Sequence, residues 1–191
     1  MTDGPFRNLK LGSGWKRLAD AVQNDASSTT ECGLLATDGL VRHLATKENC
    51  AAAQELEAYT LQPQLDFDPR ATIEEIFDDY EKTPFLDTLK KELLYRITDG
   101  TPPAEALDLA LDAAVEEEVG EARNRFEEEC IRLRDTGKMS RHACQRAIGK
   151  TNDAFDAVNR RDVCAAIRKG DKNAFKAATA KRVGLDEGPS L

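Results

Sequence analysis

Apolar residues recur at helical spacing along most of this chain, and the pattern is clearest between residues 84 and 97. Six apolar residues follow one another there at intervals of 1, 3, 4, 1 and 3, as on one face of an α-helix. They are Phe85, Leu86, Leu89, Leu93, Leu94 and Ile97. Pro84 suits the first turn of a helix, and Gly100 stands where glycine commonly ends one. The pattern predicts a helix whose apolar face lies in the core.

A second apolar stripe is much longer. It begins after Thr101-Pro102-Pro103, a capping hydroxyl followed by proline, and its members recur about every 3.7 residues. They are Leu107, Leu111, Val115, Val119, Ala122, Phe126, Cys130 and Leu133. The stripe predicts one helix of about 30 residues, about 45 Å long, that ends near Gly137.

Shorter patterns predict four further helices before residue 83. Their ranges are 15–24, about 30–44, 48–59 and 72–82. The helix at 48–59 is rich in alanine and has little to bury. Pro63 and Pro69 separate it from the next helix, which a Thr72/Glu75 capping box is expected to open.

The composition becomes basic after Lys138. Shorter helices are expected there, at about 140–148, 152–169 and 171–182. The sequence therefore predicts an all-α fold, a multi-helix bundle with one long central helix and a basic C-terminal helical annex. The expected parts are a flexible N-terminal arm at 1–14, the bundle at 15–135, a basic helical segment at 138–183 and a disordered tail at 184–191.

Charge is sorted along the chain. Residues 54–130 contain 7 Lys and Arg against 22 Asp and Glu, a net charge of −15, whereas residues 131–183 contain 14 against 5, a net charge of +9. The whole chain carries −8. Such sorting indicates either two partners of opposite charge or one fold that neutralises itself, and the sequence leaves both alternatives open.

Composition favours a soluble cytoplasmic protein. No apolar run approaches the roughly 18 to 20 residues that a membrane span needs, and the N-terminal residues lack the apolar stretch of a signal peptide. The five cysteines are an odd number and form no CxxC pair. We therefore expect reduced thiols rather than a disulfide framework, and no membrane partner.

The sequence gives little support for a catalytic site or a cofactor-binding site. His43 and His142 are the only histidines, and no nucleophile motif accompanies them. His142 and Cys144 lie two residues apart, so on a helix they point in different directions and cannot share a metal. Asp66-Phe67-Asp68 resembles the start of a calcium loop, but Pro69 follows and no glycine holds the sixth position, so the match fails. We expect no enzyme activity, no catalytic residue, no metal and no cofactor.

Residues 139–161 resemble a helix-turn-helix in spacing, with Gly149 where the turn would lie. The candidate nucleic-acid contacts are Arg146, Lys150, Asn159, Arg160 and Arg161. Asp153 and Asp156 would repel phosphate. The favoured alternative is a basic helical hairpin whose Arg and Lys side chains bond acidic helices of the same chain.

The N-terminal arm combines apolar residues with cations ahead of Gly12-Ser13-Gly14. Its candidate partner-binding residues are Phe6, Arg7, Leu9, Lys10 and Leu11. The favoured function is a non-enzymatic helical protein-interaction subunit, or adaptor, of a larger cytoplasmic assembly. The first alternative is a DNA-binding regulator, and the second is an enzyme with an unrecognised carboxylate site. The sequence does not indicate the oligomeric state.

Overall fold

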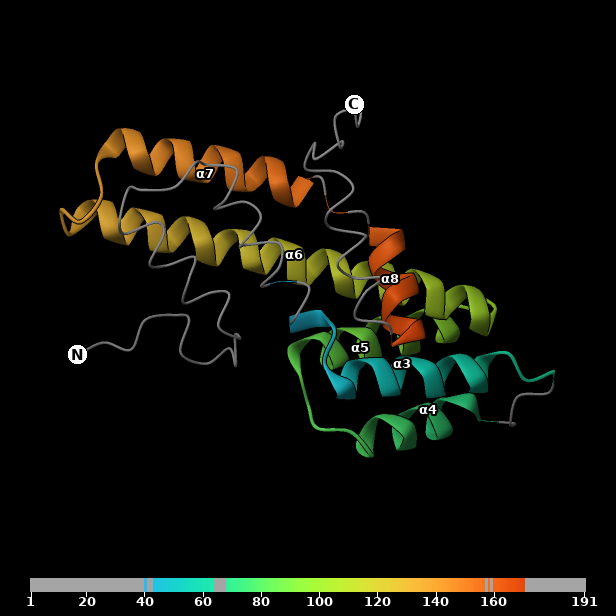
Figure 1. The fold of residues 1–191 in the computed structure, drawn as a ribbon. Coiled ribbons are helices and arrows are strands. Elements are labelled where there is room, and N and C mark those ends of the chain that lie inside the picture. The colour runs from blue at the N-terminus through green and yellow to red at the C-terminus, as the bar shows by residue number, and fades with distance from the viewer. Residues whose placement is uncertain (1–39, 41–42, 64–67, 157, 159, 171–191) are drawn as a thin grey trace, which may run out of the picture. The chain divides into compact units, whose positions relative to one another are not determined.

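Helices make up all the regular structure in the described part of the chain. The computed structural model describes residues 40, 43–63, 68–156, 158 and 160–170 (Figure 1). The helices are α3 (Lys47–Thr60), α4 (Pro69–Asp78), α5 (Pro84–Thr98), α6 (Pro103–Asp135), α7 (Arg141–Asp156) and α8 (Arg160–Lys169). The predictions of an all-α fold and of one long helix are confirmed, since α6 has 33 residues.

Several predicted segments lie outside the described residues. They are the arm at 1–14, the helix at 15–24, most of the helix at 30–44, the helix at 171–182 and the tail at 184–191.

The helices divide into two compact units whose boundary falls inside α6, between Glu118 and Val119. The α8 unit contains α3, α4, α5, the first half of α6 and α8. The α7 unit contains the second half of α6, α7 and the described residues 40 and 43.

The apolar stripes predicted from the sequence form the core of each unit. In α5, Phe85, Leu89 and Leu93 are completely buried, whereas Ile97 is only half-buried. In α6 every predicted stripe residue is buried except Val119, which is half-buried. Hydrophobic spacing therefore located both core faces correctly.

Helix α3 buries more than its alanine-rich sequence indicates. Ala52, Ala53 and Leu56 are completely buried, and α3 packs against both α4 and α8. At the end of α8, a β-carbon on Gly170 would lie 3.1 Å from Nε2 of Gln54. The absence of a side chain at Gly170 thus allows the end of α8 to approach α3 closely. The prediction that this helix has little to bury is wrong.

Helix α4 begins earlier than predicted. Asp68 is its N-cap, with a side-chain oxygen that accepts hydrogen bonds from the backbone N–H groups of Arg70 and Ala71, and Pro69 occupies the first turn. The predicted capping box at Thr72 is wrong because Thr72 already lies inside the helix. Pro69 was correctly predicted to separate α3 from the next helix, and it is also the first residue of that helix, α4.

A buried polar contact joins the start of α5 to α3. Thr83 caps α5 by accepting a hydrogen bond from the N–H of Leu86, and its hydroxyl donates to Oδ1 of Asn49 at 2.9 Å. Asn49 is completely buried, and its Nδ2 donates to the carbonyl of Leu44 at 3.1 Å. Both ends of the Asn49 amide are therefore satisfied, as a buried polar group requires.

Helices α5 and α6 end at glycines in the left-handed region. Gly100 has a φ of +88° and Gly137 a φ of +70°. The N–H of Thr101 bonds the carbonyl of Arg96, and that of Lys138 bonds the carbonyl of Leu133, so carbonyls of each last turn are satisfied. The sequence predicted both helix ends correctly.

In the α7 unit, α6 and α7 form a helical hairpin. Ser140 caps α7 by accepting a hydrogen bond from the N–H of Ala143, and Arg123 of α6 forms an ion pair with Asp156 near the end of α7. The buried side chains from the two helices include Phe126, Cys130, Leu133, Cys144, Ala147 and Phe155. Each of the two helices thus buries an apolar face within the α7 unit.

The predicted turn at Gly149 is wrong, because Gly149 lies within the uninterrupted helix α7. Glycine lowers helix stability by about 1 kcal/mol relative to alanine, but Cys144, Ala147, Thr151 and Phe155 form a buried face on both sides of it. Burial of that face outweighs the weak propensity of one residue. The chain leaves the helix after Asp156, so the predicted second helix at 152–169 is also wrong.

We predict that Asn49→Ala lowers the free energy of unfolding by about 1 to 3 kcal/mol, because it removes the acceptor of the half-buried Thr83 hydroxyl and the donor to the Leu44 carbonyl. Denaturant unfolding followed by circular dichroism measures the change. Gln54→Ala, at an exposed position of the same helix, is the matched control. A loss below 0.5 kcal/mol (roughly the scatter of surface substitutions) would contradict the structural role of this contact.

Candidate interaction surface

Helix α8 has one apolar face and two arginines at its edge. Val163, Ala166 and Ile167 are buried, whereas Arg160 and Arg168 are half-buried. The two arginines lie eight residues apart, about 12 Å along the helix. The apolar face fixes α8 in the α8 unit, and the arginines contact the charged groups around it.

Acidic residues at four-residue spacing on α6 receive these arginines. Nη1 of Arg160 lies 2.5 Å from Oε2 of Glu116 and 3.7 Å from Oδ2 of Asp112. Arg168 forms an ion pair with Asp108. We call Asp108, Asp112 and Glu116 the α6 carboxylate ladder, since residues four apart lie on one helix face.

Arg168 also reaches α3, where its Nη1 lies 3.5 Å from Oε1 of Glu57. Its side chain is 23% exposed, against 63% for Asp108. Ion pairs with such exposed members contribute about 0.2 to 1 kcal/mol each, less than the burial of one large apolar side chain. Apolar packing therefore holds α8, and the arginines neutralise charge on α6 and α3.

The basic residues in and before α7 differ from the two half-buried arginines of α8. Lys138, in the turn before α7, is followed at every fourth residue by His142, Arg146 and Lys150 on the helix, and all four side chains are exposed. We call these residues the α7 row. Within the described part of the chain, no carboxylate lies within ion-pair distance of any of them. The basic segment thus contains two arginines of α8, Arg160 and Arg168, that pair with carboxylates of the same unit, and exposed basic residues, among them the α7 row and Arg161 and Lys169 of α8.

The structure separates the predicted nucleic-acid contacts. Arg146 and Lys150 belong to the α7 unit, whereas Arg160 and Arg161 belong to the α8 unit. Arg160 is engaged with α6, while Arg161 is exposed. Asn159 and the arm residues Phe6, Arg7, Leu9, Lys10 and Leu11 lie outside the described residues. Sequence reasoning missed the α6 carboxylate ladder, although its four-residue spacing is visible in the sequence.

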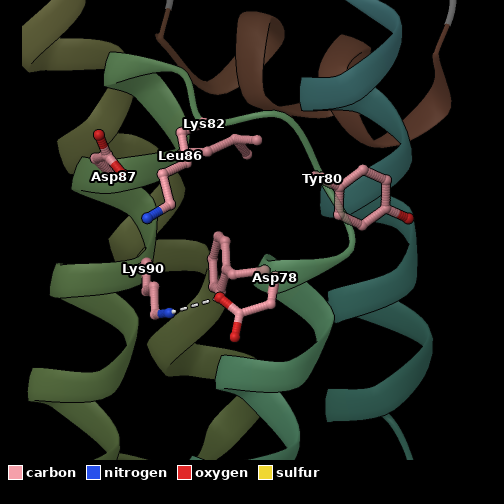
Figure 2. Close-up of a pocket in the computed structure, with 7 residues that line it drawn as sticks. Asp78, Tyr80, Lys82, Leu86, Asp87 and Lys90 are labelled. Carbon is pink, nitrogen blue, oxygen red and sulfur yellow. Dashed lines mark ion pairs between the residues drawn. The ribbon is translucent and has the colours of Figure 1, made fainter.

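A pocket of about 260 Å³ lies beside α4 and α5 (Figure 2). It is lined by Phe77, Asp78, Tyr80, Lys82, Leu86, Asp87 and Lys90. Nζ of Lys90 lies 3.7 Å from Oδ1 of Asp78 and 5.8 Å from the centre of the Phe77 ring. The lining contains two lysines and two aspartates, so the pocket presents no single charge to a ligand.

Tyr80 contributes to this wall, but its hydroxyl points toward α3 (Figure 2). There it donates a hydrogen bond to Oε2 of Glu55 at 2.5 Å. The acceptor carboxylate favours the protonated phenol, and partial burial adds to the effect, so the pKa of Tyr80 rises to about 12. This bond ties the segment after α4 to α3.

None of the four described cysteines forms a disulfide bond, and the pKa values of two of them are raised. Burial, together with the nearby Asp112 carboxylate, raises the pKa of Cys164 to about 12. Burial also raises the pKa of Cys144. Since the thiolate is the nucleophilic form, these two thiols are weak nucleophiles near neutral pH.

Three further observations bear on the function of the chain. Among the described residues, no group of three or more His, Cys, Asp or Glu side chains could hold a metal ion. No helix in this part of the chain is both long enough and apolar enough to cross a membrane. No known protein family, curated protein or solved structure matches this sequence.

We predict that Tyr80 ionises near pH 12 in the variant Tyr59→Phe/Tyr95→Phe, in which it is the only remaining tyrosine. The folded-state pKa lies above the unfolded value of about 10, so the stabilisation is fully present below pH 10 and is lost as the pH rises toward 12. Ultraviolet absorbance of tyrosinate measures the midpoint. Adding Glu55→Gln should move the midpoint toward 10, and equal midpoints with and without Glu55 would refute the hydrogen bond.

Proposed function

We propose that this protein is a non-enzymatic helical interaction subunit that binds a protein partner within a larger cytoplasmic assembly. The proposal rests on a difference between two groups of basic residues, the half-buried arginines of α8 and the α7 row. Arg160 and Arg168 of α8 are occupied by carboxylates of the same chain, whereas the α7 row is exposed. The exposed cations are therefore available to another molecule.

The α7 row is unfavourable for the isolated helix. Arg146 and Lys150 are four residues apart, a spacing at which like charges destabilise a helix by about 0.2 to 0.5 kcal/mol. No described carboxylate lies within ion-pair distance of Arg146 or Lys150, in contrast with Arg160 and Arg168 of α8. A binding role accounts for a charge arrangement that folding alone does not favour.

Nucleic-acid binding is the second candidate function, and the same exposed Arg146 and Lys150 favour it. Three observations weigh against it. Arg160 is engaged with α6, exposed Asp153 lies one turn beyond Lys150, and the chain carries a net charge of −8. Each reduces the attraction for phosphate, so we rank a protein partner first.

We predict that the full-length protein, used as bait in the native host, retains a specific protein partner after nuclease treatment, as identified by mass spectrometry. The partner is then purified and its binding measured by titration calorimetry. An unrelated acidic helical protein of similar net charge serves as the control bait.

Two outcomes would contradict the proposal. If no protein is enriched over the control bait, the interaction function fails. If capture is lost on nuclease treatment and the purified proteins do not bind each other, nucleic-acid binding becomes the better account.

A further inference from the structure

We infer that the α7 row is the docking site for an acidic helix of another protein, with carboxylates spaced about four residues apart. The inference rests on the proposed function and specifies its partner. It is carried by the spacing of the row, by an ion-pair arrangement inside this protein and by the surface next to the row.

The spacing of the row matches a helical carboxylate ladder. The three members on α7, His142, Arg146 and Lys150, are four residues apart, a rise of about 6 Å along the helix, so His142 and Lys150 are separated by about 12 Å, whereas Lys138 lies in the turn before α7. Glu or Asp side chains four residues apart on another helix recur at the same interval. Arg146 and Lys150 can then meet successive carboxylates of one partner helix, and His142 lies one turn earlier on the same face.

The contact between α8 and α6 shows this mode of pairing within the chain. Arg160 meets Glu116 and Asp112 near one end of the α6 carboxylate ladder, and Arg168 meets Asp108 at the other end. The two helices therefore run in opposite directions along the ladder. This protein therefore already contains two helices that pair through cations on one and carboxylates at four-residue spacing on the other.

Gly149 provides space beside the row. It is exposed near the middle of α7, and a β-carbon added there would have nothing within 4 Å. Glycine at this position lowers helix stability without relieving any close contact. A smooth surface next to Arg146 and Lys150 allows the backbone of a partner helix to approach closely.

Charge and composition favour an acidic helix over other anionic partners. Residues 119–156 contain 8 Lys and Arg against 7 Asp and Glu, which is too balanced to attract a phosphate backbone strongly. No large apolar side chain is exposed on α7, so the row lacks the residues that insert into a membrane surface.

The test uses the full-length protein and two synthetic alanine-based peptides of identical composition. One peptide has glutamate at every fourth position, and the other has its glutamates in one block. We expect the first peptide to bind more tightly in fluorescence anisotropy. The variant Lys138→Glu/Arg146→Glu/Lys150→Glu should weaken that binding by at least about tenfold, since it removes three cations of the row and adds repulsion.

The control variant Lys91→Glu/Arg161→Glu/Lys169→Glu makes the same change in net charge at exposed positions of the α8 unit. It should bind the first peptide within about twofold of the unmodified protein. Titrations at two salt concentrations measure how much of any difference comes from the change in net charge. Circular dichroism verifies that both variants are folded. Gly149→Gln gives a second readout, since it should weaken peptide binding without lowering the melting temperature.

The remaining outcomes overturn the inference. Equal binding of the two peptides would mean that the affinity does not depend on the spacing of the glutamates along a helix. Tighter binding of duplex DNA or phosphatidylserine vesicles, lost in the α7 variant, would assign the row to those partners, and self-association lost in that variant would assign it to a second copy. If the captured partner binds the unmodified protein and the α7 variant equally, the interaction function stands and this inference fails.

Discussion

The packing of α8 against α3 is the contact on which the α8 unit depends, because it joins residues separated by more than 100 positions in the sequence. Val163, Ala166 and Ile167 supply the buried face of α8, and burial of each large apolar side chain contributes about 1.5 to 3 kcal/mol. The surrounding ion pairs contribute less than this. The ion pairs matter because they determine which charged residues are neutralised within the chain and which remain exposed.

Once α8 is in place, the sorted charges of the sequence acquire different roles. Arg160 and Arg168 neutralise part of the α6 carboxylate ladder and Glu57, so this part of the basic segment serves the fold. The α7 row remains exposed, so the same segment also offers cations to another molecule. Self-neutralisation and partner binding were alternatives in the sequence, and the structure supports the first for α8, leaving the second open for α7.

Local signals predicted α5 and α6 well because apolar spacing, a proline in the first turn and a terminal glycine agree in each. They failed where two signals competed. At the start of α4, Asp68 and Pro69 cap the helix before Thr72 can, and in α7 a buried apolar face outweighs Gly149. The pairing of Arg168 with Asp108 could not be predicted, because it depends on tertiary packing between residues 60 positions apart.

The most direct test of this account is a double-mutant cycle between Arg168 and Asp108, measured by denaturant unfolding at low and high salt. The account predicts that Arg168→Ala and Asp108→Ala are coupled by about 0.5 kcal/mol, that the coupling weakens in high salt, and that Arg161→Ala and Asp108→Ala are not coupled. Coupling of zero for Arg168 and Asp108, or equal coupling for both pairs, would contradict neutralisation of α8 by α6 and remove the distinction between α8 and the α7 row.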